Sequence, residues 1–343
     1  MLRLLITFLL CLPHTAQAFY QWQGDDSSIE LRGLVRASSI IANNANDEVL
    51  FAKDKILTGA GFGRLMFDAQ TSGLSFELHA VQSVSDTEFR TGGTQISAVI
   101  ERSDALHWRF RNDHADLVVD RLNMQFSGDN INIKLGRQAV NLAATFYFTP
   151  NDFFAPFAAQ TFYRTYKTGV DAARLDWQWD DLSQLSVYTV LNYPTDLTHS
   201  GNRQTAPNWN ETSILARVST LMGSFEWAIL LGQDHGDDIV GIDFQGELFD
   251  WLGVRGEGHL RFPDEQGQSR DTKFSLGLEH RFENTLTLRL EQFYQRSGAS
   301  NEQDYLLNKQ VNTNTFFLAK NYTALGATYE ITPLLNSDAV WIY

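Results

Sequence analysis

The residues of this chain that could act on a solute gather around one aromatic stretch. The stretch, TFYFTPNDFFAPFAAQTFYRTY at 145–166, carries only Asp152 and Arg164 as charges, and more charged residues flank it on both sides. Charged groups around a narrow opening focus an electric field and can select ions. We therefore predict that six residues form a constriction: Arg137, Asp152, Arg164, Lys167, Asp171 and Arg174.

The residue types needed for nucleophilic or metal-dependent catalysis occur without a recognisable arrangement. His199-Ser200 and Asp234-His235 lie in polar links, and the stretch HWRFRNDH at 107–114 lacks metal-ligand spacing. We predict no catalytic site, no metal site and no cofactor.

The first residues predict an export signal. Arg3 precedes the apolar run LLITFLLCL, which is too short to span a bilayer, and Ala16-Gln17-Ala18 fits a cleavage site. We expect a signal peptide at 1–18 and a short periplasmic segment at 19–27.

Composition excludes several classes of function. Cys11, the only cysteine, leaves with the predicted signal, so the mature chain should have no thiol chemistry. The formal net charge is −14, which argues against a nucleic-acid partner.

From about Ser28 the sequence alternates apolar and polar residues in segments separated by turns. In LGVRGEGHLRF at 252–262, leucine, valine and phenylalanine occupy one face, while arginine, glutamate and histidine occupy the other. This period of two predicts β-strands with one apolar and one wet face. We place strands near 28–41, 57–70, 74–84, 116–127, 131–139, 170–179, 185–193, 212–221, 224–233, 239–248, 252–262, 272–282, 285–295, 320–331 and 336–343.

The links between these strands alternate in length. Tight turns, such as those at 71–73 and 128–130, alternate with longer polar links at 42–56, 85–115, 140–169, 194–211, 234–238, 263–271 and 296–319. Short turns at one end and long loops at the other are typical of a transmembrane β-barrel. The predicted fold is therefore all-β, a transmembrane antiparallel up-and-down barrel spanning 28–343, with aromatic girdles near the strand ends. A soluble all-β protein is the alternative.

Fifteen expected strands conflict with the even number usual in bacterial barrels. One interpretation is that the chain is cut short at its C-terminus and that the complete protein has about 16 strands. The other is a missed strand, inside 85–115 or 296–319.

The aromatic stretch belongs to the third long link, and so apolar a loop cannot rest in water. A barrel of this size encloses a channel unless something fills it. Thr149-Pro150-Asn151-Asp152 has the pattern of a helix start. We predict a short helical element that folds inward and narrows the pore. Packing over the barrel mouth and binding to a partner are the alternatives.

The predicted inner faces carry nearly balanced charges, which we expect either to tune ion passage or simply to pair across strands. The lumen-wall candidates are Arg255, Glu257, Arg261, Glu279, Arg289 and Glu291.

Three motifs around the third link resemble porin-like outer-membrane barrels, in particular the alginate-export and phosphate-selective types and their relatives. The motifs are Leu135-Gly136-Arg137-Gln138, then Thr149-Pro150-Asn151-Asp152 with Pro156, then Tyr166–Ala172 with Arg174-Leu175-Asp176-Trp177. The resemblance implies a diffusion channel or a substrate-biased pore. The chain departs from it by lacking a convincing final strand and an arginine or lysine ladder.

We therefore expect a channel of the bacterial outer membrane that lets small hydrophilic solutes cross, surrounded by outer-membrane lipid. A homotrimer would need one wall that faces another copy instead of lipid. The second hypothesis is a plugged scaffold or adhesion barrel that partners other envelope proteins. The third is an outer-membrane barrel hydrolase.

Overall fold

The computed structural model describes residues 15–43, 55–85, 109–111, 115–157, 166–193, 207–264, 269–304, 317–333 and 335–343. Within these residues the protein is almost entirely β-structure, with two single 3₁₀ turns, Trp209–Glu211 and Glu302–Asp304. No helix in the described ranges has the length and apolar character needed to cross a membrane.

Seventeen strands form one antiparallel sheet. They are β1 (Thr15–Gln23), β2 (Ser27–Asn43), β3 (Lys55–Thr71), β4 (Leu74–Ser85), β5 (Arg109–Arg111), β6 (Ala115–Ser127), β7 (Ile131–Gln138), β8 (Val170–Asp180), β9 (Ser183–Val190), β10 (Ser213–Met222), β11 (Phe225–Asp234), β12 (Asp237–Leu248), β13 (Leu252–Phe262), β14 (Asp271–Arg281), β15 (Thr287–Gln295), β16 (Asn321–Thr332) and β17 (Leu335–Ile342).

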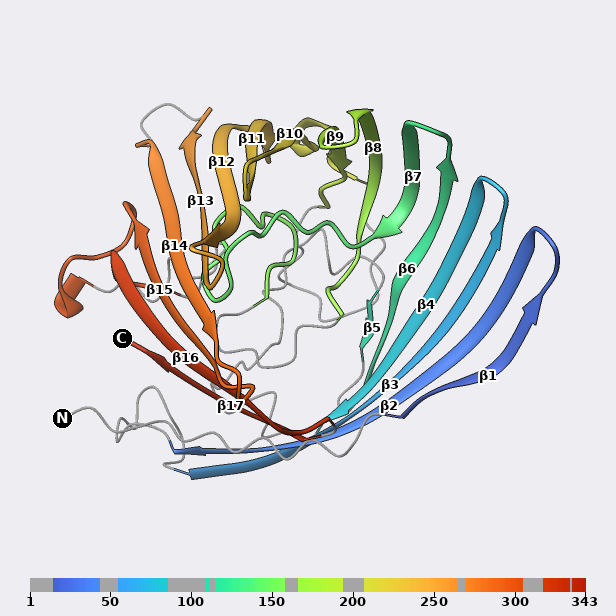
Figure 1. Cartoon of the computed structure of the whole chain (residues 1–343), viewed down its shortest axis with the longest axis horizontal. Coiled ribbons are helices and arrows are strands. Elements are labelled where there is room, and N and C mark those ends of the chain that lie inside the picture. Colours follow the sequence, from blue (N-terminus) through green and yellow to red (C-terminus); the bar gives the residue numbers. More distant parts are fainter. Residues whose placement is uncertain are drawn as a thin grey trace.

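All strands except the three-residue β5 pair with their neighbours in chain order, which gives sixteen up-and-down strands. The sheet curves around the segment that joins β7 to β8 (Figure 1). No register within the described residues joins β17 to β1, so the sheet is not closed. This is the predicted all-β, up-and-down architecture.

Each of the fifteen expected strands is present, and the pattern missed two further strands, β1 and the three-residue β5. β5 lies inside 85–115, one of the two links suspected of hiding a strand, and pairs with β6. β1 lies in neither of those links. It runs from Thr15 to Gln23 and pairs with β2, although 19–27 was expected to precede the sheet. The strands that pair in chain order, β5 left aside, are sixteen, so an odd number of strands no longer argues for a missing C-terminal strand.

The strands alternate between two chemical faces, as their period of two predicts. In β14, Phe274 and Leu276 are each 47% exposed on the outer face, while the alternating residues Lys273 and Ser275 are buried on the inner face. Of the eight aromatic residues that we expect near the strand ends, Trp227 and Phe262 are only partly exposed, and the others are exposed: Trp177, Trp179, Trp251, Phe282, Tyr329 and Trp341.

One link is tighter than expected. The segment at 234–238 was counted among the long links, yet β11 and β12 are joined by His235 and Gly236 alone. Both residues have positive φ, 54° and 88°, which suits a two-residue hairpin turn. The predicted alternation of short and long links therefore fails at this hairpin.

Candidate functional site

The segment between β7 and β8, residues 139–169, is here called the inner loop. Its described residues, 139–157 and 166–169, lie within the curve of the sheet, along its inner face (Figure 1). Its described side chains are largely buried: Phe153, Phe154 and Ala155 are at most 1% exposed. The predicted inward folding of the third long link is therefore what the structure shows for residues 139–157 and 166–169.

The first apolar contact of the loop is with the wall between β8 and β12. Phe153 and Phe154 pack in one cluster with inner-face side chains of the strands, among them Leu215, Leu230 and Ile239. Burying an aromatic side chain of this size stabilises the protein by about 1.5–3 kcal/mol. The wall is thus apolar on both faces here, which answers how so aromatic a loop is kept from water.

The second apolar contact is with β15 and β16. The Phe148 ring stacks on Phe293 with centroids 5.2 Å apart, and its edge meets Phe317 at 5.0 Å. Tyr147 lies directly over Gly326, where an added Cβ would overlap the Tyr147 hydroxyl oxygen. Glycine at this position of β16 therefore makes room for the loop.

A buried carboxylate of β13 holds the polar backbone of the loop. Glu257 is 3% exposed and accepts hydrogen bonds from three backbone N–H groups. Thr145 N and Asn151 N each lie 2.8 Å from a carboxylate oxygen, and Ala144 N donates to the same group. Glu257 thereby joins two separated parts of the loop to one point of the wall.

A second carboxylate, Glu291 of β15, does the same for the aromatic tip. The backbone N–H groups of Phe146, Tyr147 and Phe148 donate to its oxygens at 2.8, 3.0 and 2.5 Å. The Ser275 hydroxyl donates to it at 3.1 Å. These bonds give acceptors to buried N–H groups that would otherwise be unpaired, so they fix the tip against the wall.

The predicted helical element is absent from the described part of the loop. In an α-helix capped by Thr149, the Phe153 N–H would donate to the Thr149 carbonyl oxygen. It donates instead to the Asn151 oxygen at 3.1 Å, and Asp152 N donates to the Thr149 oxygen at 3.0 Å, so the backbone closes only tight turns. Asn151 N, one of the first N–H groups that a helix leaves without an internal partner, donates to Glu257.

Two of the predicted constriction residues form a buried ion pair at the base of the loop. Lys167 and Asp152 are in direct contact, and both are at most 6% exposed. Burial raises the pKa of Asp152 and lowers the pKa of Lys167, because each charged form has lost its water. Each charge therefore depends on the other.

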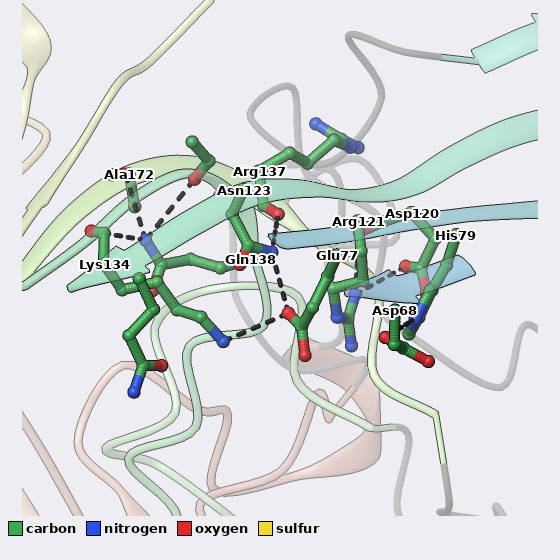
Figure 2. A network of polar contacts seen from close by, with 12 residues as sticks. Asp68, Glu77, His79, Asp120, Arg121, Asn123, Lys134, Arg137, Gln138 and Ala172 are labelled. Atoms are coloured by element: carbon green, nitrogen blue, oxygen red, sulfur yellow. Dashed lines mark hydrogen bonds and ion pairs between the residues drawn. The ribbon is translucent and has the colours of Figure 1, made fainter. Parts of the chain in front are cut away.

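The returning end of the loop is held by β6. Arg121 donates to the Lys167 carbonyl oxygen at 2.7 Å, and Asp120 accepts from Gly169 N at 3.0 Å. Arg64 of β3 pairs with Asp120 at 2.5 Å. Figure 2 shows Asp120 and Arg121 beside His79 and the other polar side chains of this wall.

The departing end of the loop is tied to β4, β6 and β8. Asn123 donates to Glu77 and to the Arg137 carbonyl oxygen, both at 2.9 Å, and Lys134 reaches Glu77 at 3.1 Å (Figure 2). Gln138 donates to the Ala172 carbonyl oxygen at 3.0 Å. The chain thus leaves the wall at a fixed point.

The other predicted constriction residues are distributed differently. Arg137 is 1% exposed and lies 3.4 Å from Asp171, while Arg174 is one-third exposed and lies 2.8 Å from Asp176. Arg164 lies outside the described residues. A role of these six residues in ion selection stays a prediction.

The lumen-wall candidates divide into three groups. Glu257 and Glu291 hold the loop, a role that sequence reasoning missed. Arg261 bonds Asp234 and Asp237 near the β11–β12 hairpin. The remaining three, Arg255, Glu279 and Arg289, form one ion-paired group.

Asp234 lies between His235 and a neighbouring serine. Ser213 Oγ and His235 Nδ1 lie 3.0 and 2.8 Å from the same oxygen of Asp234. In a serine hydrolase the imidazole lies between the serine and the aspartate, and these contacts have the aspartate in the middle. The segments 107–108, 112–114 and 199–200 lie outside the described residues. Among the described side chains, no three His, Cys, Asp or Glu residues could hold a metal ion together.

The fold and the inward loop define a porin-like β-barrel. The Rh. blastica porin, in the form of a variant, has a TM-score of 0.53 and 12% identity, and the match covers 92% of this chain and 94% of that one. Salmonella typhi OmpF, in complex with daunomycin, has a TM-score of 0.54 and 9% identity, and the match covers 94% and 92%.

These likenesses establish the fold. They give no support to the alginate-export and phosphate-selective types in particular. No protein-family model matches the chain, and no curated protein matches it.

Proposed function

We propose that this protein is an outer-membrane channel through which small hydrophilic solutes diffuse, with the inner loop narrowing the path. The observation that carries the proposal is the pair of wall carboxylates, Glu257 and Glu291, which fix the loop on the inner face of a porin-like sheet. A loop held at both its tip and its middle is suited to set the width of a pore. The porin neighbours support the same function by fold.

The outer face of the sheet supports a place in a lipid bilayer. Large apolar side chains such as Leu276, Leu290 and Ile242 are 42–50% exposed there, on strands from one end of the sheet to the other. Soluble proteins rarely expose such continuous apolar surface. We propose that residues 1–18 direct export to the bacterial outer membrane. Cleavage after Ala18 would leave Phe19–Gln23 of β1 in place.

The experiment is single-channel conductance of the refolded full chain in a planar bilayer, beside a variant lacking residues 146–163. We expect open channels from the full chain and wider ones from the deletion variant. A heat-modifiable band on a gel would show that each protein is a folded barrel.

Current from neither protein, with both folded, would reject the channel and with it the proposed function. Current from the deletion variant alone would mean that the loop is a plug, and would favour the scaffold or adhesion barrel. The deep burial of Phe153 and Phe154 is the observation on which that second function rests.

A further inference from the structure

Between the loop anchors and the short turns, the inner face carries a band of charged side chains. The registers place Glu226, Gln245 and Arg255 directly across from one another on β11, β12 and β13. Neighbouring strands are about 4.8 Å apart, so Glu226 and Arg255 stand about 10 Å apart along the wall. The band is organised in two triads of opposite charge.

The positive triad lies on β13, β14 and β15. Glu279 stands between two arginines, at 3.3 Å from Arg255 and in direct contact with Arg289. Glu279 and Arg255 are each about one-quarter exposed. Two guanidinium groups share one carboxylate, so the triad has a formal net charge of +1.

The negative triad lies on β10, β11 and β12 and has the reverse composition. Arg217 stands between two carboxylates, at 2.7 Å from Asp243 and 3.1 Å from Glu226. One guanidinium group is shared by two carboxylates, so the triad has a formal net charge of −1. Gln245 bonds Glu226 at 3.0 Å and separates the two triads.

Further ion pairs lie on other strands of the described inner face. Lys134 binds Glu77 at 3.1 Å, Arg174 binds Asp176 at 2.8 Å, and Arg32 contacts both Asp68 at 2.7 Å and Glu30 at 3.3 Å. Fixed charge of one sign is what makes a pore prefer one kind of ion. Neighbouring charges of opposite sign cancel beyond a few ångströms in water, and salt screens what remains.

We propose that the two triads balance one another and make the pore nearly indifferent to the sign of charge. It then admits cations and anions about equally, and its substrates are small hydrophilic solutes without net charge. This inference rests on the proposed function, since it assumes an open path along the inner face. Glu279 and Arg217 are the residues on which the balance depends.

The test is the reversal potential of the refolded full chain in a dilute KCl gradient. We expect a cation-to-anion permeability ratio within about twofold of unity for the native protein. Glu279→Gln should shift the ratio toward anions and Arg217→Gln toward cations. By Coulomb's law, one unbalanced charge about 7–10 Å from the ions in water changes the local concentration of each ion about two- to threefold in opposite directions, and therefore the permeability ratio about four- to sevenfold. The control is Glu283→Gln, the same change of charge in an exposed turn.

Three outcomes would overturn the inference while leaving the channel intact. One is a native preference of about tenfold or more for either ion, which is beyond the effect of a single unbalanced charge. The second is a shift in the same direction for both variants. The third is a shift of the permeability ratio in Glu283→Gln that is as large as the shifts in Glu279→Gln and Arg217→Gln. The native measurement and the two variants are independent, so failure of one variant to fold leaves the others decisive. An absence of all current would reject the channel, and this inference with it.

Discussion

Replacing Glu291 by alanine should release the aromatic tip of the inner loop from the wall. The change removes the acceptor of three buried backbone N–H groups, those of Phe146, Tyr147 and Phe148. A buried donor without a partner costs about 1–3 kcal/mol. The three costs overlap, because one movement exposes all three groups to water. We therefore expect the attached state to lose about 3–6 kcal/mol, which corresponds to a factor of about 10²–10⁴ in its population relative to the released state.

The assay is amide hydrogen exchange measured by mass spectrometry on the refolded full chain. Exchange through local opening reports the free energy of that opening. Peptides covering 144–151 should exchange about 10²–10⁴-fold faster in Glu291→Ala. Glu291→Gln keeps one acceptor oxygen and should fall between the native protein and Glu291→Ala. Glu283→Ala, in an exposed turn, serves as the matched control. Unchanged protection of these peptides in Glu291→Ala would refute the anchoring role of this carboxylate.

The remaining predictions concern the base and the tip of the loop. Asp152→Asn and Lys167→Met should each lower the urea midpoint of the folded barrel by an amount equal to about 3–5 kcal/mol, while the double variant loses less than either single one. Additive losses would mean that the two charges are not coupled. Gly326→Val should dislodge the Tyr147 ring and raise the single-channel conductance, whereas Gly61→Ala, whose added Cβ meets open space, should not. Equal conductance in both variants would contradict the close contact at Gly326.

The strands were predictable because their signal is local. An apolar outer face and a wet inner face give a period of two within about ten residues, and no distant contact is needed to read it. β1 escaped because its residues, TAQAFYQWQ, overlap the predicted cleavage site and therefore suggested processing instead of pairing. The two-residue turn at His235 and Gly236 was not predicted, because the aspartates within 234–238 suggested a longer polar loop.

The conformation of the inner loop was not predictable to the same degree. Its burial follows from its aromatic content, but its partners lie far away along the chain. The hydrogen bonds from Ala144 and Thr145 reach Glu257 across 113 and 112 positions, and those from Phe146 reach Glu291 across 145. The helix signal at Thr149 describes only a local preference, and the backbone that follows closes tight turns instead. Nothing in the spacing of Glu257 and Glu291 distinguishes them from other inner-face acids.

The use of carboxylates as anchors follows from the chemistry of a loop without regular structure. A segment that forms neither helix nor strand leaves its N–H groups unpaired, and burying them costs free energy unless acceptors are supplied. Apolar contacts alone would bury the rings of Phe148 and Phe153 but would leave those N–H groups unpaired. Glu257 and Glu291 each accept hydrogen bonds from three N–H groups at one position of a strand. These bonds fix the orientation of the loop as well as its distance from the wall. These two residues of the wall thereby fix the tip and the middle of the described loop against the inner face of the sheet.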